Sequence, residues 1–385
     1  MAPLDFASEV VAGGADALSV LTDPDFFGGS LATLAALAKA GVPTLMKDIL
    51  VDERQLDAAR TAGAAAVLLI ERVLGADRRA ILVRAAHDRG LEVLLETHGL
   101  RETEAVRGAR ADLVGVNARD LATFQVDRAE ALAAVRVAAD HGPTLLLSGV
   151  RDRRDVAEAA AHGATAILVG TSVLRSPVPR LAVRALRRPL AKVCGLRDAD
   201  GVVCASGADL AGFILSDGSP RAAAPADLPA LMEQARDVGL APVLVTDVPD
   251  PARILAAARQ AKPTLVQLHG PAKAAAASLN KAGFTVFFAT QPGEAIAADA
   301  EGVVLDSGAG GSGEAHDWRL DGRSLAGRRG LLAFVAGGLD ADNAPAALAA
   351  SGAAGADASS RLETSPGRKD RARVRAFIAA VQGAA

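Results

Sequence analysis

Aromatic residues and cysteines are scarce in this chain of 385 residues, which has no tyrosine, one tryptophan and 3% aromatics in all. So few rings leave few platforms on which nucleic-acid bases could stack, and the net charge of −3 comes from interleaved acids and bases without a basic stripe. Two cysteines, Cys194 and Cys204, cannot build a disulfide framework, and no His/Cys cluster has the spacing of metal ligands. The composition therefore argues against a nucleic-acid partner, a metal site and a disulfide scaffold.

Long hydrophobic runs are also missing, although 50% of the residues are hydrophobic. No apolar run approaches the ~20 residues that a membrane-spanning helix needs. The first residues, MAPLDFASEV, lack the basic region and apolar core of a secretory signal. We therefore expect a soluble cytoplasmic protein without a membrane partner.

The length is greater than one ordinary core requires and fits two domains of about 190 residues. Segments rich in Val, Ile and Leu alternate with Ala/Arg/Glu-rich segments of helical period, which is typical of βα units around a parallel sheet. The stretch from 176 to 190 contains three prolines and an Arg-rich helical pattern, and we interpret it as the junction. The predicted domains are residues 1–180 and 190–385.

The second half contains enough strand candidates to close a barrel, because eight parallel strands form a closed ring. In such barrels the carboxyl ends of the strands meet at one face, where the chemistry is usually found. The expected strands are 190–196, 209–215, 241–247, 264–270, 285–291, 302–307, 331–338 and 355–360.

The first half offers one strand fewer. A barrel without one strand has two unpaired edges and an open core, so the count indicates that a βα unit before Met1 is absent. The predicted fold class is therefore α/β, with two tandem (β/α)8 TIM barrels of which the first lacks its first strand. The expected strands of this half are 15–21, 43–48, 66–70, 91–96, 112–117, 144–148 and 165–170.

Two side chains in the second half suit proton transfer. Cys194 ends the first expected strand and Asp306 ends the sixth. Taken alone, a strand cysteine is more often an inert small hydrophobe, and an aspartate before a Gly-rich loop is often a turn residue. A base and an acid facing one barrel mouth, however, are what proton transfer between two substrate atoms requires.

The loops after the seventh and eighth expected strands are candidates for holding a phosphate, because such loops present backbone N–H groups. Gly337 and Gly338 allow close backbone approach, and Ser359 and Ser360 add donors at an expected helix start. Arg221 has the fork-shaped cation that pairs with carboxylates, although a single arginine is more often solvated. Small anionic metabolites are the expected ligands.

In order and spacing, six motifs of the second half resemble phosphoribosylanthranilate isomerase of tryptophan biosynthesis. The resemblance implies an Amadori rearrangement of a phosphorylated anthranilate–sugar substrate, with Asp306 as general acid and Cys194 as general base. It also implies that Arg221 holds the anthranilate carboxylate, that His269 lies near the mouth, and that no cofactor is needed. The family usually has a small residue where this chain has Arg361, which affects the phosphate loop. The motifs are KVCGLRDADG, GFILSDGSPR, VQLHG, VVLDSGAGGSGEAHDW, VAGGLDADN and SSRLETSPGRKD.

Three expected strand ends of the first half carry Lys47, Glu96 and Asn117, which could supply an acid, a base and a polar anchor. Each alone is more often a capping or solvated residue. With SVLTDPDFFGGS, SGVRDRRDV and ILVGTSVL they resemble indole-3-glycerol phosphate synthase, and the fused order resembles the bifunctional bacterial protein. The resemblance implies Lys47 as general acid and Glu96 as general base. It further implies substrate contacts by Asn117 and Arg119 and phosphate contacts by Ser148, Gly149, Gly170 and Thr171.

The first half departs from its family at sites of catalytic charge. The first-strand motif with its Glu, Lys and SPS loop has no counterpart, Leu147 stands where the family has a Glu, and Ile49 replaces an aromatic residue. Losing one cation and two carboxylates removes much of the electrostatic stabilisation of ring closure, so we expect a weak or inactive synthase. Two alternatives stay open: a first barrel that is only a structural or assembly scaffold for the isomerase, or a whole chain that is a phosphate-binding pseudoenzyme in which Cys194 is buried far from Asp306. A monomer is the expected oligomeric state.

Overall fold

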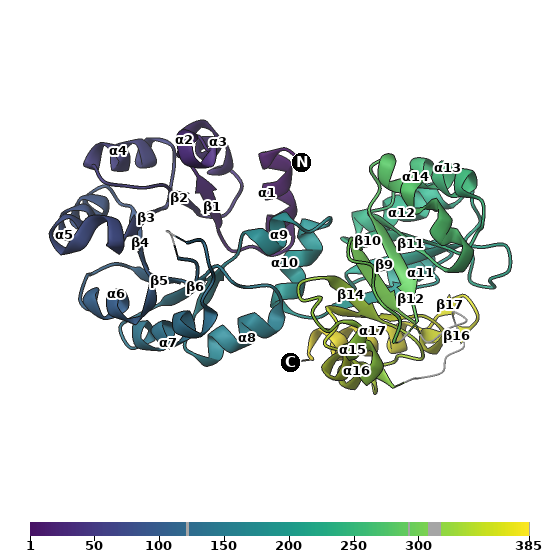
Figure 1. Ribbon diagram of the computed structural model, residues 1–385. Coiled ribbons are helices and arrows are strands. Elements are labelled where there is room, and N and C mark those ends of the chain that lie inside the picture. Colours follow the sequence, from purple (N-terminus) through teal and green to yellow (C-terminus); the bar gives the residue numbers. More distant parts are fainter. Residues whose placement is uncertain (121–122, 292, 307–316, 385) are drawn as a thin grey trace. The chain divides into compact units, whose positions relative to one another are not determined.

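The computed structural model describes residues 1–120, 123–291, 293–306 and 317–384. The chain divides into two compact units, Met1–Arg175 and Ser176–Ala385. Figure 1 shows both units and labels most of their helices and strands. Each unit is built around its own parallel sheet, as the alternating pattern of the sequence predicts.

The first unit contains an open seven-stranded sheet in which every pair of neighbours is parallel and follows chain order. Six of the seven strands described lie within the ranges predicted from the sequence, and β4 extends one residue beyond its range, to Thr97. The strands β1 and β7 form the two edges of the described sheet. The strands are β1 (Leu18–Leu21), β2 (Thr44–Lys47), β3 (Ala66–Ile70), β4 (Glu92–Thr97), β5 (Leu113–Asn117), β6 (Thr144–Leu147) and β7 (Ala166–Leu168).

Several helices of the first unit begin at side-chain caps that the sequence supplies. Asp52 accepts the N–H of Arg54 and forms a capping box with Gln55, and Asp152 caps the helix that follows it. The helices are α1 (Pro3–Ala12), α2 (Pro24–Phe27), α3 (Leu31–Leu37), α4 (Glu53–Thr61), α5 (Glu71–Asp88), α6 (Gly99–Ala105), α7 (Arg128–Ala139), α8 (Arg153–Ala161) and α9 (Thr171–Leu174).

Burial across this open sheet differs between its middle and its edges. The central strands are almost fully buried, whereas Ala166 on β7 is exposed and its neighbours Ile167 and Leu168 are half-buried. Leu21 at the end of β1 is 38% exposed. Both edges therefore leave apolar surface in contact with water, which is the cost expected of a barrel that is not closed.

The second unit contains a closed barrel in which all eight neighbouring pairs are parallel. All eight strands lie within the predicted ranges. They are β8 (Leu190–Cys194), β9 (Leu210–Leu215), β10 (Ala241–Thr246), β11 (Leu265–Leu268), β12 (Val286–Thr290), β13 (Gly302–Leu305), β14 (Leu332–Val335) and β15 (Gly355–Ala358).

Helices surround this barrel, and a short antiparallel hairpin of β16 (Glu363–Ser365) and β17 (Arg368–Lys369) follows the last barrel strand. No helix in the described part of the chain combines the length and hydrophobicity of a membrane span. The helices are α10 (Pro179–Arg187), α11 (Ala199–Cys204), α12 (Leu228–Asp237), α13 (Pro251–Ala261), η1 (Gly270–Ala275), α14 (Ala276–Lys281), α15 (Trp318–Ser324), α16 (Ala344–Ser351), η2 (Ser360–Leu362) and α17 (Arg371–Gln382).

The segment interpreted as an interdomain junction belongs to the second unit in the structure. Its helix α10 contributes Val178, just before the helix, and Leu181 to the apolar cluster inside the barrel. Arg188 donates two hydrogen bonds, of 2.8 and 2.9 Å, to the buried carboxylate of Asp209, which precedes β9. Helix α10 therefore covers the amino-terminal end of the barrel strands, and the functional face lies at the opposite end.

Candidate functional site

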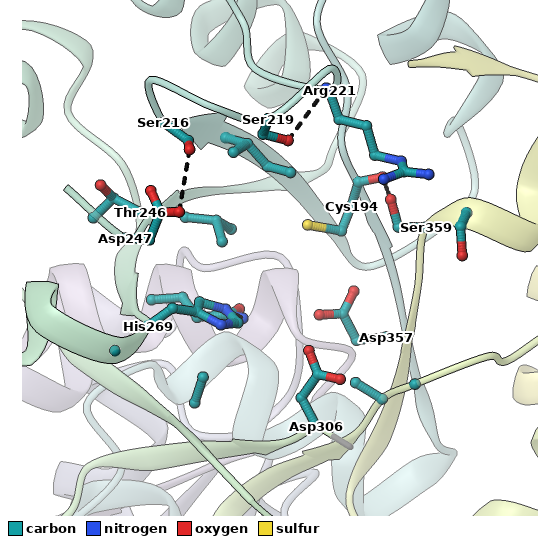
Figure 2. A pocket seen from close by; sticks show the side chains of 18 of the residues that line it. Cys194, Ser216, Ser219, Arg221, Thr246, Asp247, His269, Asp306, Asp357 and Ser359 are labelled. Carbon is teal, nitrogen blue, oxygen red and sulfur yellow. Dashed lines mark hydrogen bonds between the residues drawn. The ribbon is translucent and has the colours of Figure 1, made fainter. Parts of the chain in front are cut away.

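A cavity of about 650 Å³ occupies the carboxyl-terminal end of the second barrel. Every one of the eight strands contributes a lining residue at or just after its end, and these side chains converge in Figure 2. The residues predicted from the sequence for this barrel all line the cavity: Cys194, Arg221, His269, Asp306, Gly337, Gly338, Ser359 and Ser360.

Cys194 ends β8, and its sulfur points into the cavity (Figure 2). Space for the sulfur comes from Gly212 on the neighbouring strand, because a Cβ there would lie 2.7 Å from Sγ. Burial raises the pKa of the Cys194 thiol, while the positive charges of Lys192 and Lys369 oppose this shift. Cys194 as a residue is only 8% exposed, yet it lines the cavity and can be reached by a ligand there.

Asp306 directly follows β13, and its backbone N–H donates to the carbonyl of Thr290 at 3.0 Å. Its carboxylate points into the cavity that Cys194 also lines (Figure 2). The pseudoenzyme alternative required Cys194 to be buried far from Asp306; Cys194 is buried, but the two side chains share one cavity. Part of the motif VVLDSGAGGSGEAHDW, residues 307–316, lies outside the described residues.

A buried ionic pair beneath the mouth escaped the sequence analysis. Lys192 lies two residues before Cys194 on β8, and its Nζ donates to Asp357 at 2.5 Å and to Gln267 at 2.8 Å. Gln267 continues the chain of contacts to His269, with 2.8 Å between the side-chain nitrogens. Strand alternation could have revealed Lys192, since residues i and i+2 share a face and Cys194 was already assigned to the mouth.

Burial disfavours the charged forms of Lys192 and Asp357, whereas the attraction between the two side chains favours them. Burial lowers the pKa of Lys192, but attraction to Asp357, Cys194 and Asp306 outweighs this and leaves the pKa above its ordinary value. Burial raises the pKa of Asp357, with Lys192 acting against the shift. The lysine therefore stays protonated and places a fixed positive charge below the mouth.

His269 is neutral at physiological pH, because burial and the charge of Lys192 lower the pKa of its imidazole to about 4. The unfolded chain takes up this proton near pH 6.5, so stability is complete above that value and is lost as the pH falls toward 4. We expect the free energy of unfolding of this unit to fall by up to about 1.4 kcal/mol per pH unit across that window. Urea unfolding at several pH values measures this, and His269→Gln should remove its contribution; an unchanged pH dependence would contradict it.

Arg221 reaches the cavity from the loop after β9 and is held by Glu363. Its Nε donates to the two carboxylate oxygens at 2.9 and 3.1 Å. Glu363 also accepts from Lys369 at 2.8 Å, and both of these residues are buried. The sequence analysis identified Arg221 but missed its two partners, since their proximity depends on the hairpin of β16 and β17.

The two predicted phosphate loops lie side by side at the cavity. Gly337 and Gly338 have positive φ values of 89° and 59°, which explains why glycine occupies both positions. The helix start expected at Ser359 and Ser360 is instead the three-residue 3₁₀ helix η2, and Ser359 Oγ donates to the carbonyl of Cys194 at 3.0 Å. The unusual Arg361 pairs with Asp340 at 2.8 Å, which connects the two loops.

In the first unit, the predicted acid, base and anchor are in contact. Lys47 Nζ lies 3.5 Å from Glu96 Oε2, and Asn117 donates to Glu96 Oε1 at 3.0 Å. The backbone N–H of Arg119 donates to the Asn117 side chain at 3.0 Å. The three side chains lie at the carboxyl ends of their strands. Glu96 is fully buried and Lys47 is half-buried, so water has limited access to the group.

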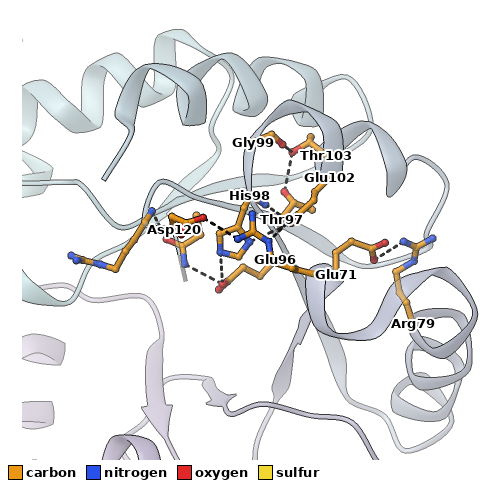
Figure 3. A network of polar contacts seen from close by, with 12 residues as sticks. Glu71, Arg79, Glu96, Thr97, His98, Gly99, Glu102, Thr103 and Asp120 are labelled. Carbon is orange, nitrogen blue, oxygen red and sulfur yellow. Dashed lines mark hydrogen bonds and ion pairs between the residues drawn. The ribbon is translucent and has the colours of Figure 1, made fainter. Parts of the chain in front are cut away.

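Figure 3 shows that this group continues into a larger polar network around the end of β4. His98 lies 3.4 Å from Glu96 and 3.3 Å from Glu102, which in turn accepts from Arg72 at 2.6 Å. Arg72 also contacts Asp120 at 3.0 Å. The sequence analysis missed His98 and Glu102, although the two-residue spacing of Glu96 and His98 was visible.

The other predicted residues of the first unit lie in the loops after β6 and β7. Leu147 is buried at the position of the family glutamate, and it packs so closely that a Cβ at Gly115 would lie 2.8 Å from its side chain. Ser148 has a φ of 64° and Gly149 of 71°. Gly170 and Thr171 begin the short helix α9 and are exposed. The apolar side chain of Leu147 thus fills space beside the polar network.

Comparison with known proteins places each half in a family. The family model described as indole-3-glycerol phosphate synthase matches residues 1–186, and that of N-(5'phosphoribosyl)anthranilate (PRA) isomerase matches residues 191–380. Indole-3-glycerol phosphate synthase from Halobacterium salinarum is 44% identical over 178 residues, which are 46% of this chain and 69% of that protein. For the synthase from Haloarcula marismortui the identity is 42% over 176 residues, and the matched region spans 64% of its length.

Two further similarities concern the whole chain and the second half. Tryptophan biosynthesis protein TRP1 from Phytophthora nicotianae is 28% identical over an alignment of 467 positions, covering 99% of this chain and 88% of that protein. The crystal structure of TrpF from Jonesia denitrificans is 32% identical and covers 51% of this chain and 98% of its own, with a TM-score of 0.44. The chain therefore belongs to the indole-3-glycerol phosphate synthase family over residues 1–186 and to the phosphoribosylanthranilate isomerase family over residues 191–380.

Proposed function

We propose that the second unit isomerises N-(5-phosphoribosyl)anthranilate to 1-(2-carboxyphenylamino)-1-deoxyribulose 5-phosphate, in the pathway to tryptophan. The single observation that supports this most is that Cys194 and Asp306 line one cavity at the carboxyl end of a closed barrel. An acid and a base fixed around one ligand meet the requirement of a rearrangement that moves protons between neighbouring atoms. The catalytic domain in this proposal is residues 190–385, with α10 as its cover.

The reaction divides into two proton transfers. The protonated carboxyl of Asp306 donates to the ribose ring oxygen, the C1–O bond breaks, and the anthranilate nitrogen supplies its electron pair to form a Schiff base at C1. The Cys194 thiolate then takes the proton from C2, and the C2–H electrons form a C1–C2 double bond while the nitrogen regains its pair. The resulting enolamine becomes a ketone when C1 takes up a proton and the C2 hydroxyl releases its proton, so that C2=O replaces the C1–C2 double bond. No cofactor is required.

The charges around the cavity suit an anionic substrate. Burial raises the pKa of the Cys194 thiol, and the positive charges of Lys192 and Lys369 oppose this rise and so assist formation of the thiolate. Arg221 would bind the anthranilate carboxylate, and His269 would contact the substrate near the mouth. The phosphate would bind to the loops at Gly337, Gly338, Ser359 and Ser360. In this proposal the protein is a monomer of the cytoplasm, and its ligands are phosphorylated anthranilate–sugar compounds.

For the first unit we propose a weak or inactive indole-3-glycerol phosphate synthase, in which Lys47 would act as general acid and Glu96 as general base. Asn117 and Arg119 would contact substrate, and Ser148, Gly149, Gly170 and Thr171 its phosphate. Leu147 in place of a carboxylate and the open sheet both support low activity, because ring closure and decarboxylation depend on preorganised charge. Failure of this chain to complement a synthase-deficient strain is the expected result, and growth at the wild-type rate would refute it.

The open sheet also favours a second role for the first unit, as a scaffold of the isomerase. Removal of residues 1–175 tests this, because the cut leaves α10 with its barrel. A scaffold's loss should reduce the yield or solubility of the isomerase and leave its kcat unchanged. If the remaining unit is as soluble as the full chain, the scaffold role is refuted.

A coupled assay tests the isomerase proposal directly. The loss of phosphoribosylanthranilate fluorescence reports the first reaction, and the appearance of indole-3-glycerol phosphate reports the second. We expect rapid loss of fluorescence with little or no indole product. A substrate that stays stable in the presence of the unaltered chain would overturn the proposal.

A further inference from the structure

A buried group of three charges lies beside the cavity, outside the proposed proton-transfer chemistry. Arg221 has 15% of its side chain exposed, Glu363 3% and Lys369 1%. The carboxylate of Glu363 accepts from both cations, from Arg221 Nε at 2.9 Å and from Lys369 at 2.8 Å. Glu363 lies on β16 and Lys369 on β17, so the hairpin brings the group together.

The charges of this group do not cancel. Two cations share one carboxylate, which leaves one positive charge largely removed from water. Among the residues that the structure describes, the Arg221 side chain donates hydrogen bonds only through Nε, and its two terminal nitrogens donate none. Removing a cation from water costs free energy unless an anion pairs with it. A guanidinium can offer a carboxylate two parallel N–H donors.

Lys369 also connects this group to the end of β8. Its Nζ donates to the carbonyl of Ser359 at 3.2 Å and to Ser359 Oγ at 3.3 Å. Ser359 in turn donates to the carbonyl of Cys194. Gly195, which follows Cys194, has a φ of 76° and lies close to both Ser359 and Arg221. A Cβ at this position would be 2.8 Å from Ser359 Oγ and 3.2 Å from Arg221 Cδ, so the two side chains pack tightly against the glycine. The contacts leave Arg221 little freedom to change its position.

We propose that Glu363 and Lys369 are positioning residues for carboxylate recognition: they hold Arg221 through Nε so that its terminal nitrogens face the ring carboxylate of the substrate. The inference rests on the proposed isomerase function and adds the two residues that make Arg221 selective. Without Glu363, the Arg221 side chain loses its fixed orientation and two buried cations lack a counter-ion. Without Lys369, Glu363 neutralises Arg221 alone, so less positive charge remains for the ligand.

Binding of two matched ligands tests this without requiring turnover. One is reduced 1-(o-carboxyphenylamino)-1-deoxyribulose 5-phosphate, and the other is the same molecule without the carboxyl group. The ratio of their Kd values measures carboxylate recognition, and a charged hydrogen-bonded pair predicts a ratio of about 10 to 100 for the unaltered chain. We expect Glu363→Gln and Lys369→Met to reduce this ratio at least about fivefold and to raise KM. Glu363→Gln should change kcat much less than KM, whereas Lys369→Met also removes a charge that acts on Cys194. Lys369→Arg should restore most of the ratio.

Asp209→Asn is a matched control, because Asp209 is also a buried carboxylate with two arginine partners in the same barrel. It lies at the amino-terminal end of the strands, so its loss should destabilise the unit and leave the ratio unchanged. Side-chain NMR of Arg221 in the unaltered chain needs no variant. Its terminal N–H groups should exchange more slowly with the carboxylate ligand than with the other ligand, and equal exchange rates would overturn the proposal.

The outcomes separate the inference from the proposed function. If the unaltered chain turns over substrate and the Glu363 and Lys369 variants keep the full Kd ratio, the inference is wrong and the proposed function stands. If the unaltered chain does not turn over substrate, the proposed function fails, whatever the ligands show. A Kd ratio near one for the unaltered chain contradicts carboxylate recognition by Arg221 itself and therefore the inference.

Discussion

Cys194→Ser is expected to lower the kcat of the isomerase by about 10²- to 10⁴-fold, the range that general acid–base catalysis supplies. A serine hydroxyl fits the space beside Gly212, but at neutral pH it cannot supply the anion that removes the C2 proton. Fluorescence loss under saturating substrate measures the effect. Cys204→Ser is the control, because Cys204 lies on the outer helix α11 and should leave kcat unchanged. A Cys194→Ser variant with near-normal kcat would remove the thiolate from the mechanism.

Asp306→Asn tests the other half of the acid–base pair and should lower kcat by a similar factor, since an amide cannot protonate the ring oxygen. The double variant should be little worse than either single variant, because the two groups act in one sequence of proton transfers. If the kcat of the double variant falls by the product of the two single-variant factors, the two residues act independently.

Lys192→Met is expected to destabilise the second unit by about 3–5 kcal/mol, because it leaves Asp357 buried without a counter-charge. Guanidinium unfolding of the full chain measures the loss in the transition of this unit. Lys281→Met, on the surface of α14, should change stability by less than about 0.5 kcal/mol and serves as the control.

A double variant distinguishes the loss of attraction between Lys192 and Asp357 from the free-energy cost of leaving one of them buried and unpaired. Replacing both Lys192 and Asp357 with apolar residues should recover much of the stability, since a buried ion pair is often replaceable by well-packed hydrophobic side chains. The kcat should not recover, because the fixed positive charge near Cys194 is gone. Destabilisation below about 1 kcal/mol in Lys192→Met would show that the pair is better solvated than its burial indicates.

Much of the architecture was predictable from local patterns. Short Val/Ile/Leu segments predicted most strands of both sheets, because parallel strands buried on both faces are mainly apolar. The strand β15 contains none of these three residue types and was expected from its place in the repeated pattern. Placing Cys194, Asp306 and Arg221 at one mouth required only the rule that parallel strands end at the same face. Prolines and arginines in 176–190 predicted a junction, whereas in the structure α10 of this segment packs within the second unit.

The sequence alone determined the strand count of each half, the side of each barrel that carries polar residues, and the identity of the acid and base candidates. Only the tertiary structure decided which residues support them. Lys192 and Asp357 are 165 positions apart, and Arg221 and Glu363 are 142 apart, so no local pattern links them. Their pairing follows from closing the ring between β15 and β8 and from forming the β16–β17 hairpin beside the cavity. Burial makes each charge depend on a partner that only the closed barrel brings within reach.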